Sequence, residues 1–211
     1  MKFLFLLFIQ ITLVGSLKAD YSRLLLHEVV DLSEIIIEGK ITSVDELDFQ
    51  VNINEVLKGE INSNSIKIKK FKNWTCTSRW GKYEVNHRGI FALQKKNDEW
   101  QIIGAGNEGE MPIENESLFF ITIFGLKGGD TYKRYSSLKF NLNEAKDGIK
   151  EYLKVKEELQ KMIENKTILK YNPENEFLKK IKIELILRTF YLLNLSDKER
   201  EEWLKLYSEK K

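Results

Sequence analysis

The sequence predicts an α+β fold in which a small antiparallel β-barrel is followed by a C-terminal helical region of about three helices. Two observations support this fold class. Up to residue 140, short runs of β-branched and aromatic residues alternate with turn residues, and no helical pattern of about 10–15 residues separates them. From residue 141 onward, apolar residues recur at helical spacing. We therefore expect a barrel domain at 20–140 and a helical extension at 141–211.

Six β-strands are expected in the barrel domain. Residues 35–41 are almost entirely apolar, which predicts a buried strand with a bulge at Gly39. Phe49, Val51 and Ile53 alternate with polar residues, a pattern typical of a strand with one buried and one solvated face. The other strands are expected at 66–71, 89–94, 100–103 and 118–124.

The helical region begins where Asn141 and Glu144 form a capping-box pattern. Gly148 lies inside this first helix and weakens it by about 1 kcal/mol relative to Ala. Asn172 and the proline after it indicate the start of a second helix. Because residues 177–193 are apolar on more than one face, we expect this second helix to be buried on most sides.

Two further helices are expected outside this pair. A short helix at 22–32 is indicated by leucine and valine side chains at helical spacing. Ser196 and Glu199 form a second capping-box pattern, which predicts a final helix. The apolar stripe of that final helix consists of Trp203, Leu206 and Tyr207.

Residues 1–19 have the pattern of a secretory signal peptide. Lys2 is followed by a mostly apolar run at 3–14 and by small residues at 15–19. This run is shorter than the roughly 20 residues that span a bilayer, although an uncleaved anchor is the alternative. We expect a mature chain that begins near Asp20, is periplasmic or secreted, and keeps no stable membrane span.

Loss of residues 1–19 would remove two lysines and no acids, so the formal charge would fall from +2 to zero. A neutral chain is poorly suited to holding a polyanion by charge alone. The lysine-rich strand at 66–72, beside Trp74 and Trp80, would fit single-stranded nucleic acid. We interpret it instead as a solvated strand face, and expect no nucleic-acid partner.

Two unusual loops define the candidate site. Residues 73–83 hold two of the four tryptophans and the only cysteine, and residues 104–112 are rich in glycine. The strands between the loops should form a hairpin, so the chain returns to the same barrel end and brings Arg79 near Glu108 or Glu110. The alternative is that the two tryptophans only plug the barrel end. The candidate binding surface consists of Trp74, Arg79, Trp80, Tyr83, Asn107, Glu108 and Glu110.

Three strand motifs stand out within residues 33–124. They are the opening strand at 35–41, the segment 49–59 that ends in Glu-Val-Leu-Lys-Gly, and the strand at 88–93 that follows the central loop. Together they resemble the OB-fold β-barrel of the netrin-like and TIMP-like (tissue inhibitor of metalloproteinases) superfamily. With the two loops, the chain is also similar to uncharacterised exported bacterial proteins of this type.

The chain departs from the TIMP pattern at its expected mature start. TIMP-like inhibitors resemble one another in an N-terminal cysteine whose amine and carbonyl chelate the zinc of a protease. Here the expected first residue is Asp20, and no cysteine precedes Cys76. The resemblance therefore does not imply protease inhibition by zinc chelation.

The single cysteine, Cys76, cannot form an internal disulfide, so it is a buried free thiol, an intermolecular pair or a reactive group. With His87 and a carboxylate it would make a nucleophilic site, but the local sequence has no nucleophile-elbow pattern. A small apolar cysteine packed beside tryptophan is the commoner outcome. We expect no catalytic residue; the alternative is a thiol-dependent, hydrolase-like enzyme using Cys76.

Metal and cofactor sites are also not expected. His87, Glu108 and Glu110 match no metal-ligand spacing, and the two glutamates would repel a phosphate at the glycine-rich loop. We interpret the chain as an exported, non-enzymatic β-barrel module that binds a protein or glycan of the cell envelope. The sequence leaves the identity of that partner and the oligomeric state open.

Overall fold

The computed structural model describes residues 24–72, 79–104, 108–121, 137–165 and 167–192. These residues form a closed five-stranded β-barrel, three additional strands and a C-terminal helical region, so the predicted α+β fold is confirmed. The expected signal peptide at 1–19 and the expected helix after Ser196 lie outside the described residues. Among the residues that are described, no helix combines the length and apolar character needed to cross a membrane.

The barrel consists of five strands in the order β1-β2-β3-β5-β4, and it closes by pairing β4 with β1. Neighbouring strands are antiparallel except β3 and β5, which run parallel where Ile68 lies beside Trp100. This arrangement is OB-like. The strands are β1 (Ile35–Val44), β2 (Asp48–Lys58), β3 (Ser65–Lys69), β4 (Arg88–Lys96) and β5 (Glu99–Ile102).

Three more strands extend the sheet from β4: β6 (Glu110–Glu114), β7 (Ser117–Ile121) and β8 (Ser137–Asn141). β6 pairs with Arg88–Phe91, whereas β5 pairs with the other half of β4. The prediction of an uninterrupted loop at 104–112 is therefore wrong, because β6 begins at Glu110. Its sequence, Glu-Met-Pro-Ile-Glu, has low strand propensity, and pairing with β4 overrides that preference.

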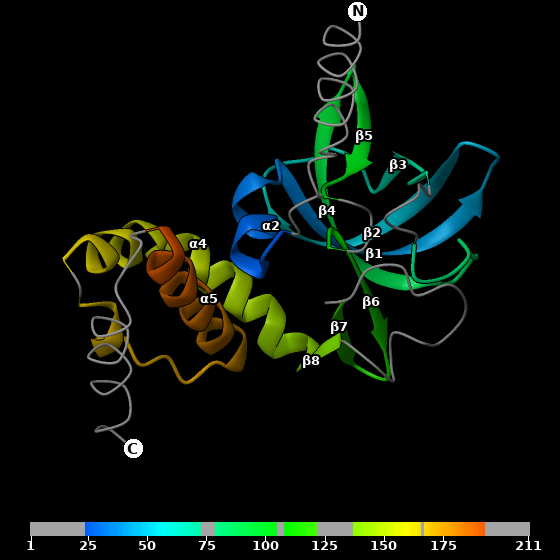
Figure 1. Cartoon of the computed structure of the whole chain (residues 1–211). Helices are drawn as coiled ribbons and strands as arrows, with labels where there is room; N and C mark the ends of the chain where they lie inside the picture. The colour runs from blue at the N-terminus through cyan, green and yellow to red at the C-terminus, as the bar shows by residue number, and fades with distance from the viewer. Residues whose placement is uncertain (1–23, 73–78, 105–107, 122–136, 166, 193–211) are drawn as a thin grey trace, which may run out of the picture.

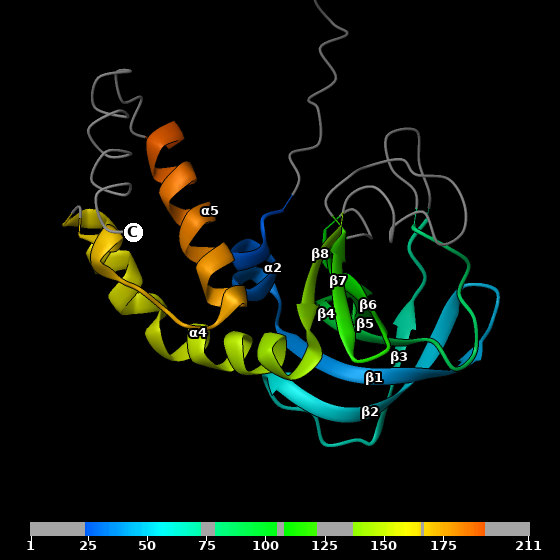
Figure 2. The same ribbon diagram turned by 90° about the horizontal axis from the view of Figure 1, so that it is seen from below.

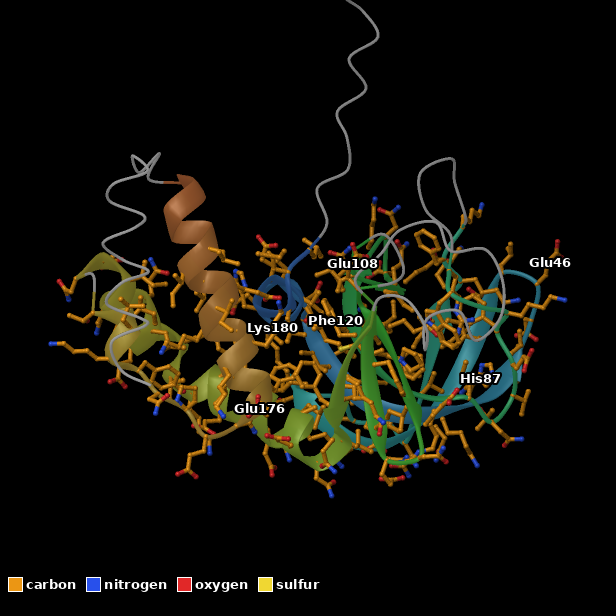
Figure 3. All side chains as sticks on the ribbon, turned by 60° about the horizontal axis from the view of Figure 1, so that its bottom comes forward. Glu46, His87, Glu108, Phe120, Glu176 and Lys180 are labelled. Carbon is orange, nitrogen blue, oxygen red and sulfur yellow. The ribbon has the colours of Figure 1, made fainter. Side chains whose placement is uncertain are left out.

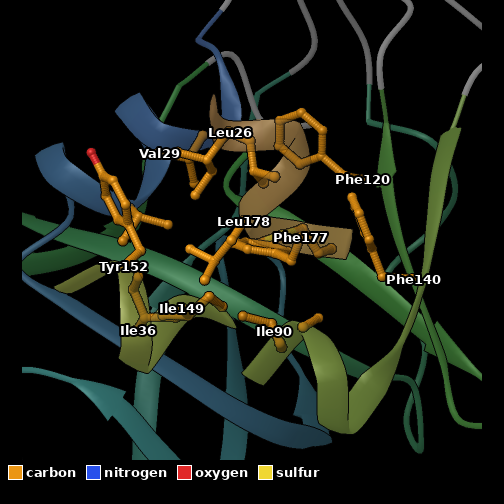
Figure 4. Packing of buried hydrophobic residues seen from close by; sticks show 14 of the residues in the cluster. Leu26, Val29, Ile36, Ile90, Phe120, Phe140, Ile149, Tyr152, Phe177 and Leu178 are labelled. Carbon is orange, nitrogen blue, oxygen red and sulfur yellow. The ribbon is translucent and has the colours of Figure 1, made fainter. Parts of the chain in front are cut away.

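Two hydrophobic cores lie on opposite sides of β1 and β4. Phe91 and Leu93 point into the barrel core, whereas Ile90 and Ala92 belong to the core shared with the helices. β1 divides in the same way, with Ile36 on the helical side. Burial on both faces explains the continuous apolar runs of these strands, because neither face needs polar residues. Figure 4 shows the core between the barrel wall and the helices.

The helical region packs on one side of the barrel (Figures 1 and 2). It consists of α4 (Leu142–Glu164), the short 3-10 helix η2 (Ile168–Lys170) and α5 (Glu176–Leu192), and α5 also contacts the N-terminal helix α2 (Leu26–Leu32). Asn141 caps α4 as expected, with its side chain accepting hydrogen bonds from two backbone N–H groups.

The start of α5 differs from the prediction. We expected Asn172 to cap this helix, but the helix begins at Glu176, and the Asn175 side chain accepts from the Leu178 N–H at 3.1 Å. Asn175 is held there because its amide donates to a backbone carbonyl of α4 at 2.8 Å. Gly148 permits this close approach, since a Cβ at that position would lie 2.7 Å from the Asn175 side-chain oxygen.

Candidate functional site

The structure describes five of the seven residues of the candidate binding surface. Trp74, Asn107 and the free thiol Cys76 lie outside the described residues. The five described residues come from two segments that are distant in sequence. They are Arg79, Trp80, Tyr83, Glu108 and Glu110.

Arg79 and Glu110 join these two segments. The Arg79 Nε donates to Glu110 Oε2 at 2.8 Å, and Arg79 Nη2 donates to the other carboxylate oxygen. A third bond runs from Arg79 Nη1 to the carbonyl of Gly81 at 2.6 Å. The expected contact is thus present, but it is not an exposed pair, because the two side chains are only 3% and 2% exposed. Burial alone would lower the pKa of Arg79, and the neighbouring Glu110 carboxylate raises it above its ordinary value.

Aromatic rings cover the faces of the Arg79 guanidinium. Its central carbon lies 3.8 Å from the Tyr83 ring centre and 4.1 Å from the Trp80 ring centre. Tyr83 in turn stacks on Phe49 of β2, with ring centres 4.6 Å apart, and Phe49 contacts Phe91 of β4. The rings and the guanidinium therefore form a continuous stack that starts in the barrel core.

This stack closes the barrel end at which β3 leaves and β4 enters. The Tyr83 hydroxyl accepts from the backbone N–H of Phe71 at 3.0 Å, just beyond the end of β3. Burial raises the pKa of that hydroxyl, so it stays a neutral phenol. At the other side of the stack, the rings of Trp80 and His87 are 5.8 Å apart. Figure 3 places His87 on the side of the barrel away from α5.

Trp80 is 8% exposed and packs with Phe119 of β7 in a small apolar cluster. This burial favours the structural alternative for Trp80 over an exposed binding anchor. Glu108 is fully buried as well. The glycine between the two glutamates is needed for packing against β5, because a Cβ at Gly109 would lie 2.8 Å from the Ile102 side chain. Gly109 therefore lets the backbone before β6 approach the end of β5 closely.

The other polar residues considered as ligands each have a partner of opposite charge or a hydrogen-bonding neighbour. His87 Nε2 lies 3.3 Å from Glu84, and Glu110 is occupied by Arg79. Across the described ranges, no three His, Cys, Asp or Glu side chains are grouped so that they could hold a metal ion. On the lysine-rich strand, Lys67 lies 3.0 Å from Asp48, and Lys69 lies 2.9 Å from Glu99.

Sequence reasoning missed another buried carboxylate, that of Glu38 in β1. Its oxygens accept hydrogen bonds from Arg88 of β4 at 3.0 Å, from Lys146 of α4 at 2.9 Å and from Asn54 of β2 at 3.4 Å. Lys146 also binds Glu55 of β2 at 2.9 Å, so these residues connect the barrel to α4. The available signal was the single acid within the apolar run Ile-Ile-Ile-Glu-Gly.

The partners of Glu38 decide the direction of its pKa shift. Burial alone would raise the pKa, but the hydrogen bonds from Lys146, Arg88 and Asn54 lower it below the ordinary value of 4.5. Glu55 follows the same direction, chiefly through its hydrogen bonds from Lys150 and Lys146. Both carboxylates are therefore held in the charged form in the folded protein.

No protein-family model and no curated protein matches this chain. The geometry around Glu110 and Glu38 is therefore the basis on which a function can be inferred. Arg79 and Glu110 form a two-bond pair, and Glu38 accepts hydrogen bonds from three side chains. Both are arrangements that fix the positions of chain segments.

Proposed function

We propose that this chain is an exported, non-enzymatic β-barrel module that binds a protein or glycan of the cell envelope. The binding surface would consist of residues from the loop at 73–83 and from the segment before β6, which the Arg79–Glu110 pair connects. In this proposal the buried members of the site hold the scaffold, and the side chains attached to it make the contacts.

The observation that carries the proposal is the completeness of the Arg79 environment. Three hydrogen bonds and two aromatic rings surround the guanidinium, and the Arg79 side chain is only 3% exposed, so it is not open to a substrate. Such a group suits a support that pre-orients neighbouring residues, which lowers the ordering cost of binding. Trp74 is five residues from Arg79 in the chain, and Asn107 is three residues from Glu110.

The resemblance to netrin-like and TIMP-like barrels agrees with a binding role outside the cytoplasm. It remains a resemblance of sequence motifs. Together with the signal-peptide pattern at 1–19, it supports an exported module with a partner in the envelope. The departure at Asp20 keeps zinc-dependent protease inhibition out of the proposal.

The test is capture of a partner from cell-envelope extracts with purified wild-type chain and the variant Trp74→Ala. We expect Trp74→Ala to lose the captured partner while its melting temperature stays that of the wild type, since a binding anchor contributes to affinity and not to folding. Leu187→Ala is the matched control, because Leu187 is an exposed apolar residue of α5, away from the loops. Equal capture by all three proteins would contradict the proposal.

The alternative function is a thiol-dependent, hydrolase-like enzyme that uses Cys76. Of the two histidines, His27 is buried between α2 and α5 against Glu184, which leaves His87 as the candidate base. His87 lies beside Glu84, so a carboxylate is at hand to orient it. Thiol reactivity of the native protein separates the two functions: an activated thiolate reacts rapidly below pH 7, and an ordinary buried thiol does not.

A further inference from the structure

One face of α5 is left uncovered by the described part of the chain. α5 packs against α4 and α2, and it contributes buried apolar side chains to the core shared with the barrel (Figure 2). Ile183 and Leu187 lie one helical turn apart on another side of α5, and they are 38% and 56% exposed. The sequence predicts burial of this helix on most sides, so a cover for these two residues has to come from outside the described residues.

The sequence after α5 supplies an apolar stripe of its own. Residues 193–211 lie outside the described residues, and their sequence predicts a final helix with Trp203, Leu206 and Tyr207 on one side. The capping-box pattern that begins at Ser196 sets the start of this helix at residue 197. A helix of about 15 residues is marginal in water by itself, so its stripe needs an apolar partner.

The length of the connection decides the direction in which the expected helix runs. α5 ends at Leu192, which leaves residues 193–196 between the two helices. Connections of about two to five residues join helices that are antiparallel neighbours. The expected helix therefore runs back along α5.

The apolar residues of the two helices lie at matching depths. With a rise of about 1.5 Å per residue, Leu187 and Ile183 lie about 8 Å and about 14 Å from the C-terminal end of α5. By the same measure, Trp203 and Leu206 lie about 9 Å and about 14 Å from the start of the expected helix. An antiparallel pair of helices would therefore bring the two stripes level with each other.

We propose that residues 197–211 form a helix antiparallel to α5, and that Trp203 and Leu206 cover Ile183 and Leu187. A second copy of the chain is a less suitable occupant, because two exposed side chains fall short of the roughly 800 Å² per partner that a stable interface buries. A short connection also holds the chain's own segment at an effective concentration in the millimolar range. This surface is separate from the loops of the proposed function, and the inference does not rest on that function.

The test is hydrogen exchange of the full purified chain, followed by mass spectrometry of peptides that cover residues 198–207. We expect these amides to be protected in the wild type. Ile183→Ala and Leu206→Ala should each speed their exchange about tenfold, because each variant removes one side of the same contact. For the same reason, the double variant should exchange little faster than either single variant.

Two controls show whether such a change is specific. Leu47→Ala removes an exposed apolar side chain from the turn between β1 and β2, and it should leave the exchange of residues 198–207 unchanged. The amides of β1 serve as an internal reference in every sample. Wild-type exchange in β1 shows that the barrel of a variant is folded.

Three outcomes would overturn this inference. The first is exchange of residues 198–207 in the wild type at the rate of an unstructured peptide. The second is faster exchange in Leu206→Ala but not in Ile183→Ala, which would place the segment on another surface. The third is protection that falls on tenfold dilution together with a dimer in sedimentation equilibrium, which would make a second copy the occupant. The proposed function fails separately, by equal partner capture with wild type and Trp74→Ala.

Discussion

Glu110 and Glu38 are both buried glutamates on β-strands, but their charges are compensated in different ways. Glu110 is held by one cation, Arg79, which is enclosed by aromatic rings. Glu38 shares its oxygens between Arg88 and Lys146, and each of these cations also binds a second, more exposed carboxylate. Glu110 therefore depends on a single partner, and we call Arg79–Glu110 the closed pair. Glu38 belongs to a shared network with Arg88 and Lys146, which can redistribute its contacts when one member is lost.

The largest expected effect is that of Arg79→Met, which removes the cation that Glu110 binds among the described residues and keeps an apolar stem between the rings. Breaking a buried pair from one side leaves a buried charge and costs about 3–5 kcal/mol in the free energy of unfolding. Urea denaturation measures this loss. Arg88→Met is the matched control, because Glu38 keeps its ion pair with Lys146, so the loss should be smaller, about 1–2 kcal/mol.

Similar losses of stability in the two arginine variants would contradict the proposed difference between Glu110 and Glu38. A double variant, Arg79→Met with Glu110→Gln, tests whether the unpaired Glu110 carboxylate causes the loss. Removing both charges should recover part of the loss, because no buried carboxylate then remains without a cation. No recovery in the double variant would assign the cost of Arg79→Met to lost stacking with Trp80 and Tyr83 instead.

An intermediate effect is expected for Glu38→Gln, which keeps the shape of the side chain and removes its charge. The loss should be about 1–2 kcal/mol, since hydrogen bonds to charged donors weaken but Arg88 and Lys146 keep their second carboxylates. Urea denaturation is again the measurement. Glu116→Gln is the control on the exposed side of the network and should stay within about 0.5 kcal/mol of the wild type. A loss as large as that of Arg79→Met would show that the network does not redistribute its contacts.

Features of single strands could be predicted from the sequence. Alternation in β2 and the apolar run in β1 predicted the barrel strands, because burial imposes a pattern on single strands. The bulge expected at Gly39 is present as a shift in the β1–β2 register, and a Cβ at Gly39 would lie 2.5 Å from the Asn52 carbonyl. Local patterns of this kind need no knowledge of the rest of the fold.

Features that depend on distant partners could not be predicted in the same way. β6 is a strand because β5 pairs with only one half of β4 and leaves the edge at Arg88–Phe91 for β6. The start of α5 is later than expected because α4 holds Asn175. The meeting of Arg79 and Glu110 was expected from the hairpin between the two loops, but their burial was not. Burial depends on Tyr83 and Trp80, which cover Arg79 and pack in turn on Phe49 and Phe119, and no local pattern records that packing.

The smallest expected effect is the pH dependence of stability that arises from the Glu38 network. The folded-state pKa of Glu38 and of Glu55 lies below the ordinary value of 4.5. A carboxylate with a lowered folded pKa stabilises the protein above its unfolded pKa and loses that contribution as pH falls through its folded pKa. Stability from this network should therefore be complete near neutral pH and decline below about pH 4.5.

Glu38→Gln removes one of these two titrating groups, so its urea midpoint should fall less steeply than that of the wild type between about pH 5 and pH 3. Leu187→Ala changes no titrating group, so it is the control and should follow the wild-type slope. Parallel pH curves for wild type and Glu38→Gln would show that Glu38 binds protons equally in the folded and unfolded states, and the network would then contribute no acid sensitivity through this residue.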